Sequence, residues 1–273
     1  MYENQKDKSI QRLTIKMDRG YIYLNKNNYL HNIEVLKNLS RKELCLVVKA
    51  NAYGHGLEWA VKNAKESGIK WFAVASVGEG IQVKTVYGES RVLLLAEPSK
   101  NQLENVKAND IDLTVYNASF IDTLIKTGDE YSVHLKIDTG MHRLGCPPEK
   151  FHDLYKKIVD SNLNLIGICT HFPLADTDET ETKKSIELFE KTISDIDLSN
   201  MLLHVDNSAS SLYKLDNSFN MARVGIAAYG VQITAVENEN KLIPTSTDNH
   251  QIEYNDNVKH QETSHSTTYN SKK

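Results

Sequence analysis

The sequence has few cysteines and no long run of apolar residues. Its 273 residues include three cysteines, Cys45, Cys146 and Cys169, which are far apart and lack Cys-x-x-Cys spacing. This odd, scattered set excludes a disulfide framework, argues against a zinc site and favours reduced, buried thiols. No apolar stretch approaches the ~20 residues that a membrane-spanning helix needs. We therefore expect a chain that does not span a membrane.

The charge balance has no strong sign either. The net charge is -4 at pH 7, and 40% of the residues are hydrophobic. Such a balance provides no basic patch for nucleic acid. The first eight residues are charged and have no apolar core, so they do not form a signal peptide. These features predict a cytoplasmic protein with one large domain and small-molecule partners, without nucleic acid or membrane.

From residue 44 onward, strand-like apolar runs alternate with helical patterns. Eight strands are expected, at 44–49, 71–75, 91–96, 112–116, 132–137, 163–169, 201–205 and 221–224. This alternation calls for parallel pairing of buried strands, and eight units match a (β/α)8 TIM-type barrel. A doubly wound open sheet is the alternative, because alternation alone does not separate the two. The reactive residues follow many different strands, and this favours the barrel.

Three segments are expected along the chain: a polar segment at 1–18, the barrel at 19–234 and a polar tail at 235–273. The tail is dominated by Asn, Ser, Thr, Lys, His and Glu, and its apolar residues have no period. It cannot bury enough apolar area to offset its ordering entropy. We therefore expect the tail to be largely disordered.

The most informative stretch is 47–56, which reads Val-Val-Lys-Ala-Asn-Ala-Tyr-Gly-His-Gly. Lys49 ends a buried strand, where apolar neighbours favour the neutral amine that condenses with a carbonyl cofactor. The structural alternative is a lysine that reaches out to water. Tyr53 supplies a hydroxyl, and Gly54 and Gly56 allow backbone to approach a ligand. The stretch resembles the pyridoxal-phosphate lysine motif of the alanine racemases.

A second stretch, 136–145, reads Lys-Ile-Asp-Thr-Gly-Met-His-Arg-Leu-Gly and follows the fifth strand. Lys136 and Asp138 share one face of that strand, as a structural ion pair would also require. Arg143 lies in a glycine-bounded loop, and its guanidinium suits a carboxylate or phenolate. The stretch resembles a second alanine racemase motif. That resemblance implies that Arg143 contacts the cofactor's phenolic oxygen and the substrate carboxylate, and that a carbamylated Lys136 orients it.

Three further strand ends extend the resemblance. His171 belongs to a Thr-His-Phe run, which implies a histidine near the cofactor ring. Ser208 is interpreted either as an ordinary helix N-cap or as part of a phosphate site. Arg223 ends the eighth strand, close to the usual phosphate site of such barrels. The resemblance implies that Arg223 faces the pyridine nitrogen, and that the phosphate is held by Tyr53, Ser208, Gly225 and Ile226.

The resemblance covers roughly residues 21–231. It implies a pyridoxal-phosphate-dependent racemase that interconverts L- and D-alanine through a lysine Schiff base and two-base proton transfer. The implied catalytic residues are Lys49, Arg143 and His171. The implied cofactor-binding residues are Lys49, Tyr53, Arg143, His171, Asn207, Ser208, Arg223, Gly225 and Ile226. The family relationship also implies a cytoplasmic homodimer that serves D-alanine biosynthesis for the cell wall.

The resemblance fails in the tail. Family members continue into a β-rich domain with a Ser-Tyr-Gly motif, whose tyrosine is the second base in the partner's site. This chain has Thr268-Tyr269-Asn270 instead. We interpret Tyr269 as a coincidence and expect impaired racemisation. Two alternatives stay open: a non-catalytic pyridoxal-phosphate homeostasis barrel, and a serine-preferring racemase.

Overall fold

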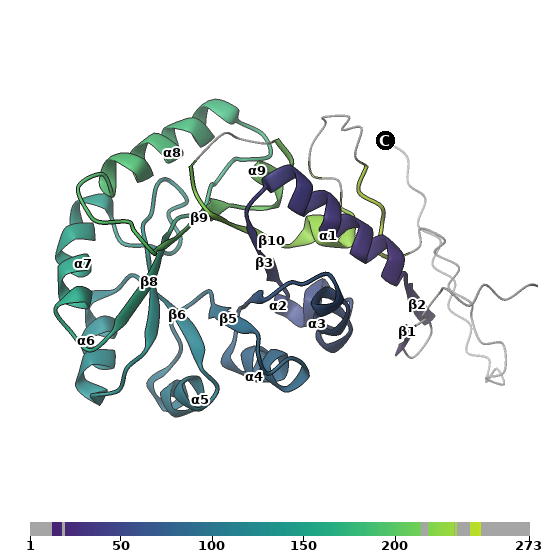
Figure 1. Ribbon diagram of the computed structural model, residues 1–273, viewed down its shortest axis with the longest axis horizontal. Coiled ribbons are helices and arrows are strands. Elements are labelled where there is room, and N and C mark those ends of the chain that lie inside the picture. The colour runs from purple at the N-terminus through teal and green to yellow at the C-terminus, as the bar shows by residue number, and fades with distance from the viewer. Residues whose placement is uncertain (1–12, 18–19, 214–217, 232, 234–240, 247–273) are drawn as a thin grey trace, which may run out of the picture.

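Eight parallel strands form a closed barrel with the order β10-β3-β4-β5-β6-β7-β8-β9. The computed structural model describes residues 13–17, 20–213, 218–231, 233 and 241–246. Helices surround the strands (Figure 1). The first and last barrel strands pair, with Met221 opposite Glu43. This closure confirms the predicted (β/α)8 barrel and excludes the open sheet.

The ends of the eight barrel strands lie within two residues of those predicted from the sequence. These strands are Glu43–Val47 (β3), Trp71–Val74 (β4), Arg91–Leu94 (β5), Ile111–Val115 (β6), Ser132–Lys136 (β7), Asn164–Cys169 (β8), Leu202–Asp206 (β9) and Met221–Val224 (β10). A separate antiparallel pair precedes the barrel, formed by Leu13–Met17 (β1) and Gly20–Leu24 (β2).

The helices follow the strands in the expected alternation. They are Lys26–Ser40 (α1), Lys49–Tyr53 (α2), Leu57–Glu66 (α3), Val77–Val86 (α4), Leu103–Ala108 (α5), Ala118–Thr127 (α6), Phe151–Val159 (α7), Glu179–Thr192 (α8) and Ser208–Tyr213 (α9). Short 3-10 turns occupy Lys100–Gln102 (η1), Pro148–Lys150 (η2) and Ile226–Tyr229 (η3). Across the described ranges, no helix is long and apolar enough to cross a membrane.

Polar side chains cap the first turns of two helices. The Asn25 side chain caps α1 by accepting a hydrogen bond from the amide of Asn28 at 3.2 Å. Ser76 and Glu79 form a capping box at the start of α4. Each cap satisfies amides that have no partner inside their helix. The carboxyl ends of the strands are thereby connected to helices by short, defined loops.

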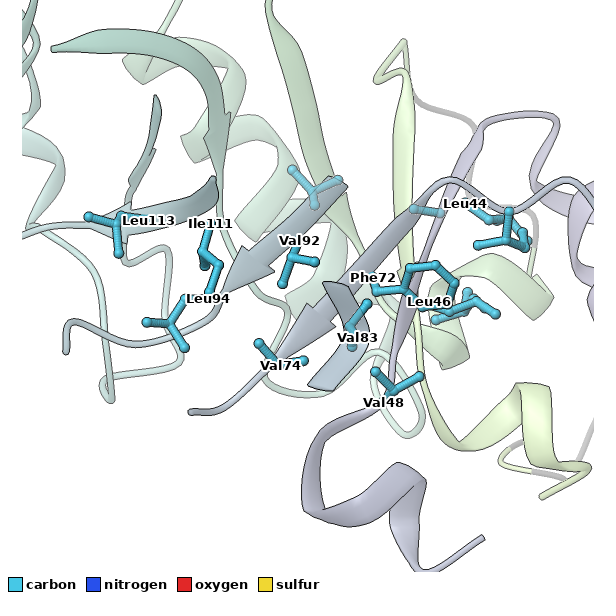
Figure 2. Close-up of a cluster of buried hydrophobic side chains, with 14 of the residues drawn as sticks. Leu44, Leu46, Val48, Phe72, Val74, Val83, Val92, Leu94, Ile111 and Leu113 are labelled. Carbon is cyan, nitrogen blue, oxygen red and sulfur yellow. The ribbon is translucent and has the colours of Figure 1, made fainter. Parts of the chain in front are cut away.

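The two faces of each strand have different surroundings, as β3 shows. Leu44, Leu46 and Val48 belong to the large core between the strands and the helices (Figure 2). Cys45 and Val47 belong to a smaller cluster that includes Trp71 and Met221 from neighbouring strands. Side chains alternate between the faces of a strand, so this second set points into the barrel. The same alternation directs residue 49 inward at the carboxyl end of β3.

Part of the expected tail is packed against the barrel. In the segment 241–246, the side chain of Thr245 is fully buried and that of Leu242 is 8% exposed. Asn32 of α1 accepts a hydrogen bond from the amide of Ile243 at 2.8 Å and donates to its carbonyl at 2.7 Å. These six residues differ from the disorder predicted for the tail. The other residues of the tail, Tyr269 among them, lie outside the described residues.

Candidate active site

A pocket with a volume of about 500 Å³ opens at the carboxyl ends of the barrel strands. All ten site residues predicted from the sequence line it: Lys49, Tyr53, Lys136, Arg143, His171, Asn207, Ser208, Arg223, Gly225 and Ile226. They come from the ends of β3, β7, β8, β9 and β10. The structure therefore places them in one cavity, while the role of each residue stays a prediction.

The short element α2, which begins at Lys49, is a left-handed turn that the sequence did not predict. Strand β3 ends at Val47, and the next four residues after Lys49 all have φ between 52° and 55°. Left-handed backbone costs an ordinary residue roughly 1–2 kcal/mol. The Lys49 side chain is half-buried, and its amine lies 6.0 Å from the centroid of the Tyr53 ring. The turn brings these two side chains to the same side of the pocket.

Backbone and side-chain hydrogen bonds stabilise this turn. The amide of Ala52 donates to the Val48 carbonyl at 2.8 Å, and the amide of Gly54 donates to the Ala50 carbonyl at 3.1 Å. The Asn51 side chain accepts from the amide of Leu57 at 2.8 Å. Gly54 has φ 88° and ends the turn.

The expected role of the two glycines differs from the observed one. Gly54 and Gly56, which both have φ 88°, do not line the pocket. They let the chain leave the left-handed turn, because glycine adopts positive φ without a steric penalty. The glycine at which the backbone closely approaches another pocket group is instead Gly225. A Cβ atom there would lie 2.4 Å from the Tyr53 hydroxyl oxygen.

Hydroxyl and amide groups gather beside Gly225. The Ser208 hydroxyl accepts hydrogen bonds from the amides of Gly225, at 2.9 Å, and Ala227, at 3.4 Å. Burial raises the pKa of the Tyr53 hydroxyl to about 12, so it stays protonated at neutral pH. Backbone amides and neutral hydroxyls are the donors that bind a phosphate group. The arrangement fits the phosphate site that the resemblance implies.

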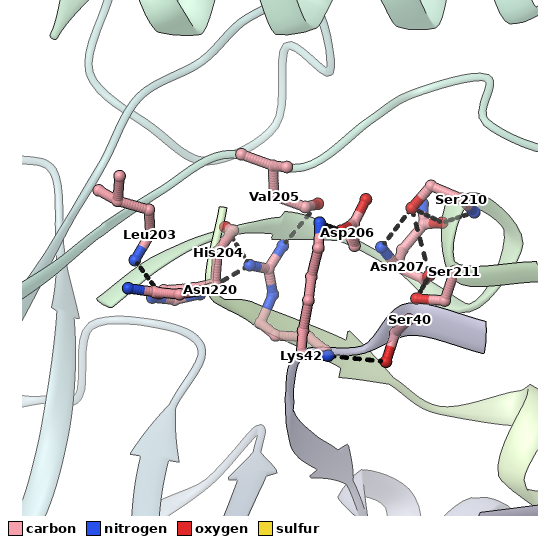
Figure 3. Close-up of polar contacts among 11 residues, drawn as sticks. Ser40, Lys42, Leu203, His204, Val205, Asp206, Asn207, Ser210, Ser211 and Asn220 are labelled. Carbon is pink, nitrogen blue, oxygen red and sulfur yellow. Dashed lines mark hydrogen bonds and ion pairs between the residues drawn. The ribbon is translucent and has the colours of Figure 1, made fainter. Parts of the chain in front are cut away.

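Asn207, and not Ser208, caps α9. The Asn207 side chain accepts from the amides of Ala209, at 3.0 Å, and Ser210, at 3.1 Å (Figure 3). The ordinary N-cap role considered for Ser208 is therefore filled by its neighbour. The Ser208 hydroxyl is left to contact η3 across the pocket wall.

Arg223 is 7% exposed and bonds to several groups at the ends of β8 and β9. It donates to the His204 carbonyl, to the Thr170 carbonyl at 2.6 Å and to the Val205 carbonyl at 3.4 Å. It also contacts Nδ1 of His204 at 2.7 Å and Nδ1 of His171 at 3.4 Å. Burial and the nearby Arg223 cation lower the pKa of His171 to about 3, so this ring is neutral at pH 7.

Two barrel histidines extend this network and were missed from the sequence. Nε2 of His204 lies 2.8 Å from Nδ1 of His134, and both rings are fully buried. Nε2 of His134 has no hydrogen-bond partner among the described residues, and the Trp71 ring stands edge-on at 5.8 Å. Period-two spacing was the available signal, because His134 lies two residues before Lys136 on the inward face.

The loop that carries Arg143 is shaped by Asp138. Its carboxylate accepts hydrogen bonds from the amides of Gly140 and His142, each at 3.0 Å. These bonds account for an acidic residue at this position, so an ion pair with Lys136 is not needed to explain it. Arg143 itself is exposed at the pocket mouth. Lys136 is 9% exposed; burial, with the cations Arg223 and Arg143 nearby, lowers its pKa. The neutral form of the Lys136 amine is therefore more accessible than in an exposed lysine.

The comparison with known proteins gives a consistent result. The family described as alanine racemase, N-terminal domain, matches residues 24–233. The alanine racemase of Treponema denticola is 36% identical over 218 residues, which are 75% of this chain and 58% of that protein. That of Treponema pallidum is 32% identical over 218 residues, 74% of this chain and 58% of that protein.

Among solved structures, alanine racemase from Clostridium difficile 630 superimposes with a TM-score of 0.78 at 28% identity. The match covers 85% of this chain and 64% of that chain. The chain therefore spans less than two thirds of the length of the relatives and of the structure that it matches.

Proposed function

Because this chain belongs to the family of alanine racemase N-terminal domains, we propose that its pocket binds pyridoxal phosphate and acts on alanine. One observation carries the proposal. Lys49 lines the same cavity of about 500 Å³ as the donor cluster of Tyr53, Ser208 and Gly225. Together, an amine and a phosphate cradle in one cavity fit a cofactor that carries both an aldehyde and a phosphate.

The polar groups that line the pocket fit the chemistry of the cofactor. The Tyr53 and Ser208 hydroxyls with the Gly225 amide would hold the phosphate, because the Tyr53 hydroxyl lies directly beside Gly225, which has no side chain of its own. Arg223 would lie toward the pyridine nitrogen. When bound, pyridoxal phosphate supplies an aldehyde that condenses with amines and a ring that withdraws electrons from the substrate's α-carbon.

Each side chain then has a defined task. Lys49 holds the cofactor and moves the α-proton on one face of the substrate. Arg143, at the pocket mouth, pairs with the substrate carboxylate. Arg223 donates hydrogen bonds and accepts none, so it leaves the ring nitrogen without a proton. With Arg223 in this place, the bound cofactor would supply a weaker electron sink, and this would favour return of a proton to the α-carbon.

Racemisation needs a base on each face of the α-carbon. Two described histidines line the pocket, the half-buried His171 and the fully buried His204. The pKa of His171 is lowered to about 3, and this makes it a weak base. We propose that none of the described residues is the efficient second base and that Tyr269 does not supply it. A positioned base contributes typically 10²–10⁴-fold, so the 273-residue chain alone should exchange the α-proton faster than it racemises.

The first test is covalent trapping. The chain is mixed with pyridoxal phosphate, reduced with borohydride and digested, and the pyridoxyl adduct is mapped. It should lie on Lys49, with Lys150, whose side chain is 64% exposed, as the internal measure of non-specific reaction. Adducts spread equally over surface lysines would refute the proposed cofactor site.

The second test separates the candidate activities. L-alanine and L-serine are incubated in D₂O with the loaded chain, and α-deuterium and chirality are measured. Deuterium uptake in alanine that exceeds racemisation supports the proposal. Preferential uptake in serine indicates the serine racemase alternative. Cofactor binding without uptake in either amino acid indicates the non-catalytic homeostasis alternative.

We also propose that Lys136 carries a carbamate. The neutral amine attacks CO₂ with loss of a proton, and the lowered pKa raises the share of this neutral form. The product anion would lie near the cations Arg143 and Arg223. Addition of ¹³C-labelled bicarbonate should give a carbamate signal in the NMR spectrum that is lost in Lys136→Arg. A signal that persists in this variant would assign the carbamate elsewhere.

The cellular setting follows from the family relationship alone. We propose that the chain acts on free alanine in the cytoplasm, for D-alanine and the cell wall, as part of a homodimer. Sedimentation of the loaded chain measures the assembly, and a purely monomeric species would contradict the dimer.

A further inference from the structure

We propose that Glu79 is a positioning residue for Lys49. This proposal rests on the proposed function, because it concerns the placement of the amine that holds the cofactor. Glu79 belongs to α4 and follows the end of β4, whereas Lys49 follows the end of β3. Its carboxylate bonds to backbone amides at both strand ends, those of Ala50 and Ala75. Lys49 and Ala75 both line the pocket.

Both carboxylate oxygens of Glu79 are used. Oε1 accepts from the amide of Ala50 at 2.6 Å. Oε2 accepts from the amides of Ala75, at 2.9 Å, and Ser76, at 3.2 Å. The Ser76 contact is the ordinary capping-box bond of α4. The Ala50 contact is not part of any cap of α4, because Ala50 lies on a different loop of the barrel.

The Ala50 contact acts on Lys49 through one peptide group. The amide N–H of Ala50 and the carbonyl of Lys49 belong to the same planar unit, so fixing one fixes the other. That plane sets the ψ angle of Lys49 and hence the direction in which its side chain leaves the backbone. Ala50 has φ 52°, a conformation that alanine does not favour. A charged acceptor aimed at its amide holds the backbone there.

A second carboxylate provides the comparison. Oε1 of Glu97, after β5, accepts from the amides of Tyr116 and Asn117, each at 3.1 Å, at the end of β6. Glu97 therefore ties two neighbouring strand ends as Glu79 does, but no lysine follows β6. Loss of the Glu97 contact is therefore expected to loosen the barrel rim without acting on Lys49.

The decisive variant is Glu79→Gln. Glutamine keeps the size and the helix preference of glutamate but has one acceptor oxygen, and its NH₂ group faces amide donors. It cannot satisfy Ala50 and the Ala75–Ser76 pair together. Two controls are matched to it. Ser76→Ala removes the other half of the capping box and leaves the Ala50 contact. Glu97→Gln removes the equivalent tie at β6.

The first measurement needs no cofactor. Amide hydrogen exchange of Ala50 should be at least about tenfold faster in Glu79→Gln than in the wild type, and unchanged within about twofold in both controls. Equal exchange of Ala50 in Glu79→Gln and the wild type would overturn the proposal.

The second measurement tests placement of the amine. Lys49 is trapped in parallel with formaldehyde, which needs no binding site, and with pyridoxal phosphate, which is held by its phosphate. In Glu79→Gln, the rate at which formaldehyde modifies Lys49 should stay within about twofold of the wild-type rate. The rate with pyridoxal phosphate should fall at least about tenfold, because a misplaced amine is a disadvantage only toward a reactant that the pocket holds in one position. An equal fall in Glu97→Gln would show a general loss of structure and overturn the proposal.

The absence of a Lys49 adduct with pyridoxal phosphate in the wild type would refute the proposed function. The rate of Ala50 amide exchange would then be the test of the Glu79 contact by itself.

Discussion

Arg223 fixes the hydrogen positions of the histidines around it. A guanidinium only donates, so Nδ1 of His204, at 2.7 Å, must accept. Nε2 of His204 therefore carries the hydrogen and donates to Nδ1 of His134 at 2.8 Å. The remaining hydrogen of His134 lies on Nε2, and the centroid of its ring lies 5.8 Å from that of the Trp71 ring. The chain of bonds holds both rings neutral and Arg223 charged.

These histidines should make stability fall in acid. Burial lowers the pKa of His134 from 6.5 to about 3 and that of His204 well below 6.5. The unfolded chain binds protons that the folded chain excludes, so the contribution is complete above pH 6.5 and is lost as the pH falls toward 3. Each histidine adds a slope of up to about 1.4 kcal/mol per pH unit. Urea unfolding from pH 7 to pH 4 measures it.

The control for this pH dependence is His152, which is 52% exposed. His134→Asn should reduce the slope, whereas His152→Asn should leave it as in the wild type. A slope that is unchanged in His134→Asn would assign the acid sensitivity to other groups.

Loss of the hydroxyls beside Gly225 should weaken cofactor binding. Hydrogen bonds to charged groups contribute about 1.5–3 kcal/mol, so Ser208→Ala and Tyr53→Phe should each lower affinity for pyridoxal phosphate roughly tenfold to a hundredfold. Ser211→Ala is the control, because its hydroxyl donates to the Asn207 carbonyl on the same short helix and does not line the pocket. Fluorescence titration gives the affinities, and equal affinity in all three variants would move the phosphate site elsewhere.

At the scale of whole elements, β10 and the turn after β3 meet at one crowded point. A Cβ atom at Gly225 would lie 2.4 Å from the Tyr53 hydroxyl, so Gly225→Ala should displace the Tyr53 ring and cost about 1–3 kcal/mol of stability. In Gly78→Ala, in α4, a Cβ atom meets nothing within 4 Å. This control should gain about 0.5–1 kcal/mol because alanine favours the helix. Thermal unfolding compares the two, and a stable Gly225→Ala variant would contradict the crowding.

The strands were predictable because their apolar runs end sharply. Leu44 to Val48 is bounded by Glu43 and Lys49, and burial follows those limits. The turn after Lys49 was not predictable, because Ala50 and Ala52 give no signal of positive φ. Its conformation depends on a carboxylate from α4, 29 residues later in the sequence. Local patterns do not contain such contacts between strand ends.

The site residues were predictable as a set, and their local partners were not. Strand ends gave Lys49, Lys136 and Arg223 because parallel strands place their carboxyl ends together. Whether Ser208 or Asn207 caps α9 depends on which side chain reaches the free amides, and both residue types favour that position.

At the scale of the whole molecule, the segment 241–246 is attached to the barrel through α1. Asn32 bonds to both backbone groups of Ile243 and donates to the Ala228 carbonyl at 3.1 Å. Asn32→Ala leaves these groups unpaired, at about 1–3 kcal/mol for each that stays buried. We expect lower stability and faster proteolysis near Ile243. Asn27→Ala, at an exposed position of the same helix, is the control, and equal proteolysis in both would show that Asn32 does not hold the segment.

The pairing of β3 with β10 determines when the barrel can close during synthesis at the ribosome. β3 pairs with β4 on one side, and on the other it pairs only with β10, from Met221↔Glu43 to Val224↔Leu46. While the chain is being translated, the unpaired edge of β3 stays exposed until residue 224 has emerged, and such an edge is a site for mispairing. Lys49 follows that edge directly, so the pocket cannot form early in translation. A nascent chain stalled before β10 should therefore require chaperone protection. Borohydride reduction in the presence of pyridoxal phosphate should give no selective adduct on its Lys49.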